Sequence, residues 1–307
     1  MAERLVDVLL ASYTERNPWT PAGAYIADHQ FLERLLSIPV RQGSVQQSGL
    51  LSRSADAWVA QELRSAGFGE DEVWPRRTRP RVLPQPLAAI EAAAKGPQFA
   101  SIRRLLRGSA QANLLGQYYR KQVDVVIADW DRGAELIVST KSMLSSYWNN
   151  LRNRFEEFVG DAKNLRGRYP LAAIGIFFVV RSTILDEAGA FEFLVDMLTR
   201  LRSPDLYDAA GLVVAQWSDT DFGSWNGAIE LSDDAAVSAR LEEPPVVTLL
   251  LDRVPLPLAP ARFLADLVES VLSRTPVTYH VRSRELRLRR PLPVREDDPT
   301  DAGEPDR

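Results

Sequence analysis

Apolar residues recur at helical spacing through the first quarter of the chain. Ala2–Tyr13 and Tyr25–Leu36 repeat apolar positions every three or four residues. Ser54–Leu63 begins with a residue that can cap a helix, and Gly67, a residue that often ends one, follows shortly after. The pattern predicts an N-terminal helical region over residues 1–74.

Residues 75–86 interrupt this pattern with the sequence PRRTRPRVLPQP, which holds four prolines and four arginines. Such a composition predicts a stiff, extended connector between two regions, or a strap along a nucleic-acid backbone. Helical spacing then returns over Leu87–Lys95 and Phe99–Tyr119.

The chain next takes on the patterns of strands. Gln122–Ala128 and Glu135–Lys141 predict two strands, and Asp129–Gly133 has the composition of a hairpin loop between them. Ser142–Leu165 has the spacing of a long amphipathic helix. The continuous apolar run Leu171–Val180 predicts a strand that is covered on both faces.

The remaining pattern continues the alternation of helices and strands. Residues 188–201 and 260–273 favour helices, while 209–216 and 246–251 favour strands. The order strand, strand, helix, strand, helix, strand predicts an α/β fold with a central mixed sheet flanked by helices. We place this domain at residues 87–290.

Composition narrows the classes of protein and of site. The chain has 307 residues, 45% of them hydrophobic, no cysteine and two histidines. These counts exclude disulfides and cysteine-ligated zinc and make a histidine-rich metal site implausible, so a metal would be Mg²⁺ or Mn²⁺ held by oxygen ligands. No apolar run approaches eighteen residues, and the N-terminus does not resemble a signal peptide. A cytoplasmic protein without a membrane partner is expected.

The net charge of −4 hides an uneven distribution. The last twelve residues, EDDPTDAGEPDR, hold six acids and one arginine, so the rest of the chain is slightly basic. We expect an acidic, disordered tail over 291–307. The basic clusters elsewhere suit phosphate contacts, although each could also be a solvated surface.

One aspartate and one lysine stand out in the two predicted strands. Asp124 lies inside the apolar run of the first strand, and Lys141 ends that of the second. Because a strand alternates its faces, Ser139 and Lys141 point the same way, and the hairpin can bring Asp124 beside them. A carboxylate that holds a divalent cation next to an ammonium group suits phosphodiester hydrolysis. One carboxylate is a poor site for Mg²⁺, so a second acid is required.

The amphipathic helix offers that second acid. With its apolar stripe centred near Phe155, one polar flank is predicted to hold Ser145, Asn149, Arg152, Glu156 and Lys163. A helix packed on the sheet can turn this flank towards the end of the second strand, which makes Glu156 the first candidate and Glu157 the second. Glu135 shares the strand face of Ser139 but lies about 13 Å from it at strand rise, so it is a weaker candidate.

These residues resemble the active-site pattern of the PD-(D/E)XK nuclease superfamily: Asp, a gap, then an acid, any residue and Lys. They are similar in particular to restriction endonucleases in which serine replaces the strand acid and a glutamate on the next helix takes its place. The matching positions are Asp124, Ser139, Lys141, Glu156 and, behind it, Glu157. The resemblance covers about residues 110–217, and it departs from the pattern at Val123, where the family has proline.

The resemblance implies a restriction-endonuclease-like core and an endonuclease that cleaves double-stranded DNA with Mg²⁺, or with Mn²⁺ in its place. Cutting both strands needs two active sites, so a homodimer or a larger symmetric assembly is expected. The residues expected to contact DNA are Arg76, Arg77, Arg79, Asn149, Arg152 and Lys163. The chain has no GxxxxGK[ST] motif, so ATP is not expected as a cofactor.

Three other functions remain open at the level of sequence. The chain could be a non-catalytic DNA-binding or assembly subunit of a prokaryotic defence system, built on a nuclease-like fold. It could be a repair nuclease or an RNA-directed nuclease on the same fold. It could also be an interaction domain with no role at nucleic acids.

Overall fold

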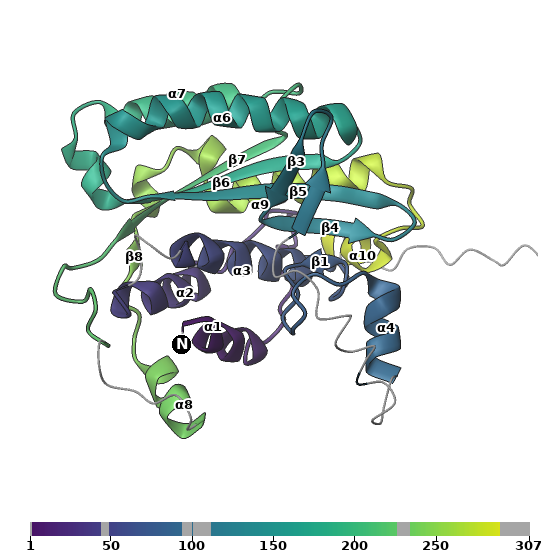
Figure 1. The fold of residues 1–307 in the computed structure, drawn as a ribbon, viewed down its shortest axis with the longest axis horizontal. Helices are drawn as coiled ribbons and strands as arrows, with labels where there is room; N and C mark the ends of the chain where they lie inside the picture. The colour runs from purple at the N-terminus through teal and green to yellow at the C-terminus, as the bar shows by residue number, and fades with distance from the viewer. Residues whose placement is uncertain (1, 44–48, 94–99, 101–111, 226–233, 289–307) are drawn as a thin grey trace, which may run out of the picture.

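The computed structural model describes residues 2–43, 49–93, 100, 112–225 and 234–288. Its centre is a six-stranded mixed sheet in the order β1-β4-β5-β6-β7-β8 (Figure 1). The strands are β1 Val73–Trp74, β4 Val125–Asp129, β5 Gly133–Met143, β6 Ala173–Arg181, β7 Ala209–Gln216 and β8 Thr248–Leu249. The predicted α/β fold with a mixed central sheet is therefore confirmed.

Two crossover helices account for the parallel part of the sheet. The pairs β5–β6 and β6–β7 are parallel, and α6 (Tyr147–Arg168) and α7 (Ala190–Leu201) connect them. The pairs β1–β4, β4–β5 and β7–β8 are antiparallel. The buried runs of β6 and β7 are apolar at nearly every position because helices cover both of their faces.

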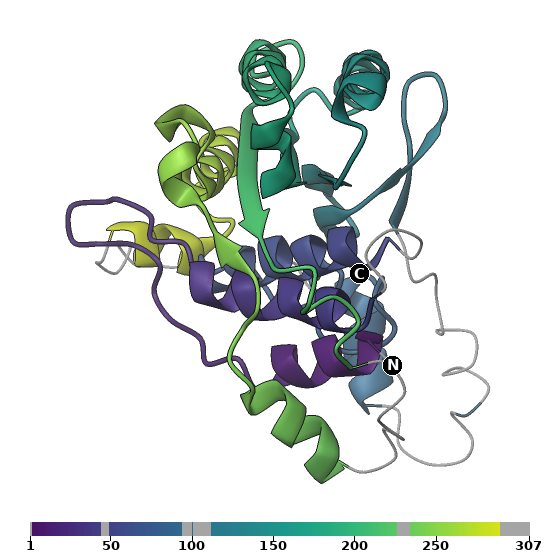
Figure 2. The same ribbon diagram turned by 90° about the vertical axis from the view of Figure 1, so that its left-hand side faces the viewer.

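The sheet separates two apolar cores, and Figure 2 shows helices on both of its sides. One core joins α6 and α7 to one face of the sheet. The other joins the opposite face to α9 (Pro260–Arg274) and to the N-terminal helices α1 (Ala2–Ala11), α2 (His29–Arg41) and α3 (Leu50–Ser65). The predicted N-terminal helical region is thus one layer of the same folded unit.

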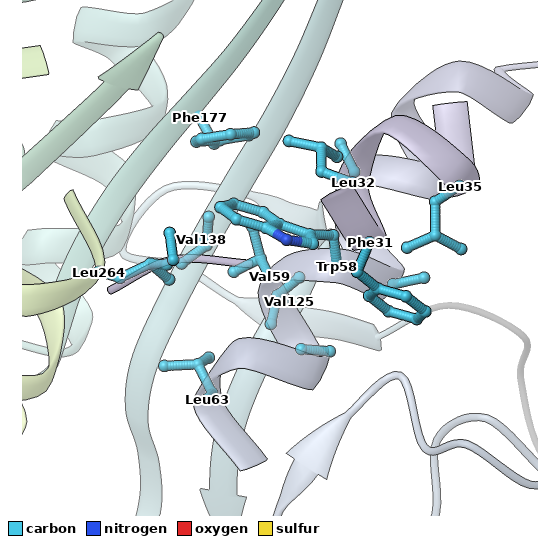
Figure 3. Packing of buried hydrophobic residues seen from close by; sticks show 14 of the residues in the cluster. Phe31, Leu32, Leu35, Trp58, Val59, Leu63, Val125, Val138, Phe177 and Leu264 are labelled. Atoms are coloured by element: carbon cyan, nitrogen blue, oxygen red, sulfur yellow. The ribbon is translucent and has the colours of Figure 1, made fainter. Parts of the chain in front are cut away.

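Helix α3 is the central element of the second core. Trp58 is fully buried, and its ring centroid lies 5.3 Å from that of Phe177 on β6. The indole N–H donates a 2.9 Å hydrogen bond to the carbonyl of Asp28, so its polar atom is satisfied. Figure 3 shows Trp58 among Val125, Val138 and Leu264, which come from two strands and from α9. This packing fixes α3 against β4 and β5.

The structure corrects two predictions before the central strands. Residues 112–119 of the helix expected over Phe99–Tyr119 are instead strand β2 (Ala112–Leu115) and a turn, and β2 pairs with β3 (Arg120–Val123) in a separate two-stranded sheet; residues 101–111 lie outside the described residues. The single strand expected over Gln122–Ala128 is two strands in different sheets, and it breaks at Asp124. The pleat cannot continue through this position because the chain leaves one sheet there and enters another.

The described residues also contain the shorter α-helices α4 (Gln85–Ala93), α8 (Asp234–Glu242) and α10 (Val281–Leu288), and the 3-10 helices η2 (Ser182–Asp186), η3 (Leu251–Arg253) and η4 (Leu256–Leu258). Helix α4 begins inside the segment expected to be a connector. In the part of the chain that the structure describes, no helix has both the length and the apolar character to cross a membrane. The acidic tail expected over 291–307 lies outside the described residues.

Candidate active site

Asp124 sits at the junction of the two sheets, where β3 ends and β4 begins. Its N–H donates a 3.2 Å hydrogen bond to the carbonyl of Val138 on β5. Its carboxylate Oδ2 accepts a 2.9 Å hydrogen bond from the N–H of Thr140 and lies 3.8 Å from Nζ of Lys141. The structure therefore brings together Asp124 and Lys141, the two residues that the sequence singled out on neighbouring strands.

A third group, Asp56 of α3, reaches the same place from the other side of β5. The hydroxyl of Thr140 donates a hydrogen bond to Oδ1 of Asp56. Leu136 and Val138 pack in the core that contains α3, and Thr140 follows them on the same strand face at a period of two residues. Thr140 thus bridges two carboxylates: its main chain binds Asp124 and its side chain binds Asp56.

A cavity of about 380 Å³ opens over these groups. Asp56, Asp124, Thr140 and Lys141 all line it. The rest of its wall comes from the N-terminal helices, the connector and the base of the β2–β3 hairpin, including Asp7, Arg53, Trp74, Arg79, Val82, Ala112 and Gln122. The cavity is therefore large enough for a polar group of a ligand to reach both carboxylates and the lysine.

The electrostatics of the site favour a cation. Burial raises the pKa of Asp56 well above its usual range, and the nearby charge of Asp124 raises it further. Burial also raises the pKa of Asp124, even though Lys141 and the Thr140 N–H both act to lower it. Two neighbouring carboxylates that are shielded from water repel each other. Both ionise only when additional positive charge lies beside them. Lys141 supplies part of that charge to both carboxylates, Arg53 acts on Asp56 and Lys121 on Asp124, and the pKa of each aspartate is still raised.

The donor set fits a hard divalent ion rather than a softer metal. Asp56 and Asp124 offer carboxylate oxygens, and Mg²⁺ commonly takes one or two carboxylates together with water and substrate phosphate. Over the described ranges, no group of three or more His, Cys, Asp or Glu is placed to hold a metal by itself. A divalent ion here would need water or the substrate to complete its coordination.

Ser139 occupies the position of the missing strand acid. It is buried, with 3% of its surface exposed, and its backbone pairs with Ile176 of β6. A hydroxyl cannot replace a carboxylate's charge, so the second negative charge at this site comes from α3.

The three glutamates expected to supply the second acid lie elsewhere. Glu156 is exposed on α6. Glu157 pairs with Arg154 and lies 3.8 Å from Nζ of Lys121. Burial opposes its ionisation, but Arg154, Lys141 and Lys121 outweigh this and lower its pKa. Within the described residues, the cavity lining includes none of Glu156, Glu157 and Glu135.

Two of the three connector arginines expected to contact DNA are engaged inside the protein. Arg76 is buried, and its Nε lies 2.6 Å from Oδ1 of Asp71. Arg77 donates a 2.8 Å hydrogen bond to Gln61. Arg79 has 64% of its side chain exposed and lines the cavity, 3.6 Å from Asp7. Arg76 also lines the cavity, and of the three arginines Arg79 is the most exposed one there.

The three polar residues expected on the flank of α6 are all exposed. Asn149 and Arg152 lie near the start of α6, and Lys163 lies close to its end. In the part of the chain that is described, none of the three lines the cavity. They are exposed on α6 and are not part of the cavity wall.

The sequence contained one signal for Asp56. It is an acid enclosed by Ala55, Ala57 and Trp58, all of them buried. A carboxylate on a helix that is otherwise packed into the core needs a partner or a function. The sequence could not show that α3 packs against the end of β5, because that contact joins residues 84 positions apart.

Comparisons of the chain with protein-family models, with curated proteins and with solved structures find no match.

Proposed function

We propose that this protein is a metal-dependent endonuclease that hydrolyses phosphodiester bonds in double-stranded DNA, on a restriction-endonuclease-like variant of the PD-(D/E)XK pattern. The observation that carries the proposal is the bridge through Thr140. It places Asp56, Asp124 and Lys141 around one cavity. In this arrangement Asp56, from the preceding helix α3, takes the role that the sequence had suggested for Glu156.

Each residue has a distinct task in the proposed reaction. Asp124 and Asp56 would hold the divalent ion through their carboxylate oxygens. A bound Mg²⁺ would lower the pKa of a water molecule and offset negative charge on the phosphate. The ammonium of Lys141 would orient the attacking water or bind a non-bridging phosphate oxygen. The Thr140 N–H and hydroxyl would keep the two carboxylates in position.

A homodimer is part of the proposal because a duplex has two strands to cut. A symmetric dimer presents two copies of the site in opposite directions, matching the antiparallel strands. Sedimentation of the protein with and without duplex DNA measures the assembly. Two protomers for each duplex is the expected result.

The test of the activity is plasmid cleavage with Mg²⁺, with Mn²⁺ and with EDTA. Wild-type protein is expected to give metal-dependent fragments, and Asp56→Asn and Asp124→Asn should each lose them. Glu156→Gln is the matched control, since it removes one exposed carboxylate near the site without touching the cavity. Cleavage that persists in EDTA, or in both aspartate variants, would rule the assignment out.

One observation favours a second candidate. Ser139 contributes no ligand at the usual acid position, as expected for a DNA-binding or assembly subunit built on a nuclease fold without cleavage activity. In that case wild-type protein would shift duplex DNA on a gel and would give no fragments with any divalent ion. The same plasmid assay separates the two functions.

A further inference from the structure

The two-stranded sheet β2–β3, which the proposed catalysis does not use, stands beside the central sheet at the level of α6 (Figures 1 and 2). We call this hairpin, residues 112–123, the ribbon. It leads directly into the site, since Asp124 is the next residue after β3. Ala112, Gln122 and Val123 at its base line the catalytic cavity. Whatever the ribbon binds must therefore lie next to the reacting group.

The ribbon is anchored firmly on one of its faces. The side chain of Asn164 on α6 accepts hydrogen bonds from the N–H groups of Tyr118 and Tyr119, at 2.8 and 3.1 Å, and donates a 3.1 Å bond to the carbonyl of Tyr119. The turn approaches so closely that a Cβ at Gly116 would lie 2.2 Å from the Asn164 amide. These contacts fix the turn of the ribbon in one orientation.

Charged contacts continue this anchoring along the same face. The hydroxyl of Tyr119 donates a 3.0 Å bond to Asp161, and Lys121 forms an ion pair with the same carboxylate. Ala112 and Val123 are buried in the core that contains α6. Asp161 of α6 is thus paired with side chains of the ribbon itself. The opposite face of the ribbon remains to contact a partner.

That opposite face is exposed and carries an arginine, two side-chain amides and one leucine. Asn113 is paired in register with Gln122, and Leu115 with Arg120, and all four are exposed. In the described part of the chain Arg120 forms no ion pair. Tyr118 at the turn has 73% of its surface exposed. The exposed cations Lys163 and Arg168 lie on the helix that carries the ribbon.

A two-stranded ribbon with these exposed side chains fits duplex DNA as its partner. The major groove of B-form DNA admits a two-stranded ribbon, and base edges there are read by arginine on guanine and by glutamine or asparagine on adenine. A ribbon whose backbone is already fixed binds with a smaller entropic cost than a mobile segment. The exposed cations match the charge of the phosphates on either side of a groove.

We infer that the exposed face of the ribbon reads base edges in the major groove of duplex DNA beside the bond that is cut. Arg120 contacts a guanine and Gln122 contacts an adenine. The inference rests on the proposed function, and it adds the element that selects the sequence. It also gives a reason for the break in the strand at Asp124, where the reading element ends and the catalytic element begins.

The test is selection of bound duplexes from a random-sequence library, without divalent metal so that nothing is cut, followed by affinity measurements on the selected duplex. The wild type should select a defined sequence. Arg120→Ala should lose discrimination at one G·C pair, and Gln122→Ala at one A·T pair, each by roughly tenfold. Affinity for the random library should fall less. Arg200→Ala, an exposed arginine on α7, is the control and should leave the selected sequence unchanged.

A modified base makes the test specific for the contact. Replacing the implicated guanine by 7-deazaguanine removes the N7 acceptor, so it should weaken binding of the wild type and have no further effect on Arg120→Ala. Equal weakening of all duplexes by both variants would instead show phosphate contacts and overturn the inference. A wild type that cleaves DNA without sequence preference would also overturn it, and would leave the nuclease proposal intact. A wild type that binds no duplex would overturn both.

Discussion

Strand β5 carries acidic groups at each end, and their pKa values are shifted in opposite directions. At its start, Glu135 lies 3.0 Å from Nε of Arg132 and 3.2 Å from Nε2 of the buried His280. Burial would raise the pKa of Glu135, but the neighbouring His280 and the hydrogen bonds from Arg132 outweigh burial and lower it. At the other end, burial raises the pKa of both Asp56 and Asp124.

The difference separates an acid held in an ion-pair network from two acids that face a cavity. Glu135 lies among several acids within 4 Å of Arg132, and with Glu72 it also lies within 4 Å of a ring nitrogen of His280, so this network ties the C-terminal segment to the sheet. Asp56 and Asp124 instead line the cavity, and their pKa values stay raised beside Lys141. Raised carboxylate pKa values in a cavity are typical of functional sites, where charge is arranged for a ligand rather than for stability.

Removing the cation of the cavity cluster should have the largest effect. Lys141→Ala takes away the ammonium that lies 3.8 Å from Asp124, and it should lower the cleavage rate by roughly 100-fold or more. Binding of duplex DNA, measured without metal, should stay within a few-fold of wild type because most of the basic surface remains. A variant that cuts at the wild-type rate would remove Lys141 from the mechanism.

Asp56→Asn should lose activity and gain stability at once. The pKa of Asp56 is higher in the folded protein than in the unfolded chain. The stability that protonated Asp56 contributes is therefore fully present at a pH below the pKa of the unfolded chain, and it is lost as the pH rises through the pKa of the folded protein. Asparagine does not ionise, so without metal the variant should melt at least about 2 °C higher than wild type at about pH 8. The gain should shrink towards about pH 4. A lower melting temperature at pH 8 would contradict the raised pKa.

The same raised pKa values predict how cleavage depends on pH. The proposed ligands must be ionised to hold the metal, so protons compete with the ion, and its apparent affinity should fall as the solution becomes more acidic. Measuring cleavage against Mg²⁺ concentration at several pH values tests this. More Mg²⁺ should be needed for half-maximal rate at each lower pH, and a midpoint that does not move would argue against Asp56 and Asp124 as ligands.

The cluster around Glu135 should respond in the opposite way. Glu135→Ala removes the carboxylate nearest to the buried His280 and to Arg132 and leaves them Glu72 at longer distances, at a cost of about 1–3 kcal/mol in the free energy of unfolding. The pKa of Glu135 is lower in the folded protein than in the unfolded chain. The stability that ionised Glu135 contributes is therefore present at a pH above the pKa of the unfolded chain, and it is lost as the pH falls through the pKa of the folded protein. Chemical denaturation measures the change. Folded Glu135→Ala protein should still cut at close to the wild-type rate.

The smallest effect is expected at Glu156. It is exposed and does not line the cavity, so Glu156→Gln should change cleavage by less than about twofold and stability by less than about 0.5 kcal/mol. Steady-state cleavage and thermal unfolding check both expectations. A loss of more than tenfold would restore the helix glutamate as the second acid.

Much of the central fold could be predicted from hydrophobic pattern alone. The segment from β5 to β7 lies within a few residues of its predicted elements, because buried parallel strands and an amphipathic crossover helix have strong periodic signals. The ribbon was missed because Leu114, Leu115, Tyr118 and Tyr119 also fit helical spacing, and the turn at Gly116 depends on Asn164, a residue far along the chain.

Of the site, the sequence could predict only the contact between residues of neighbouring strands. Asp124 and Lys141 meet because a hairpin joins their strands, and a hairpin can be recognised in the sequence. Asp56 meets them because of tertiary packing between α3 and the sheet, which no spacing reveals. Glu156 was favoured because the angular position of a residue on a helix says which flank it occupies but does not give the depth at which that helix lies over the sheet.

The central claim is that Asp56 and Asp124 together hold the metal. The most direct measurement is the binding of Mn²⁺ to the whole protein, followed by the electron paramagnetic resonance signal of the free ion, for wild type, Asp56→Asn, Asp124→Asn and Glu156→Gln. We predict that wild type and Glu156→Gln bind Mn²⁺ alike, and that both aspartate variants bind it at least about tenfold more weakly. If Asp56→Asn binds Mn²⁺ as wild type does while Glu156→Gln does not, the metal is held by the helix after the strand, and the account given by the structure is wrong.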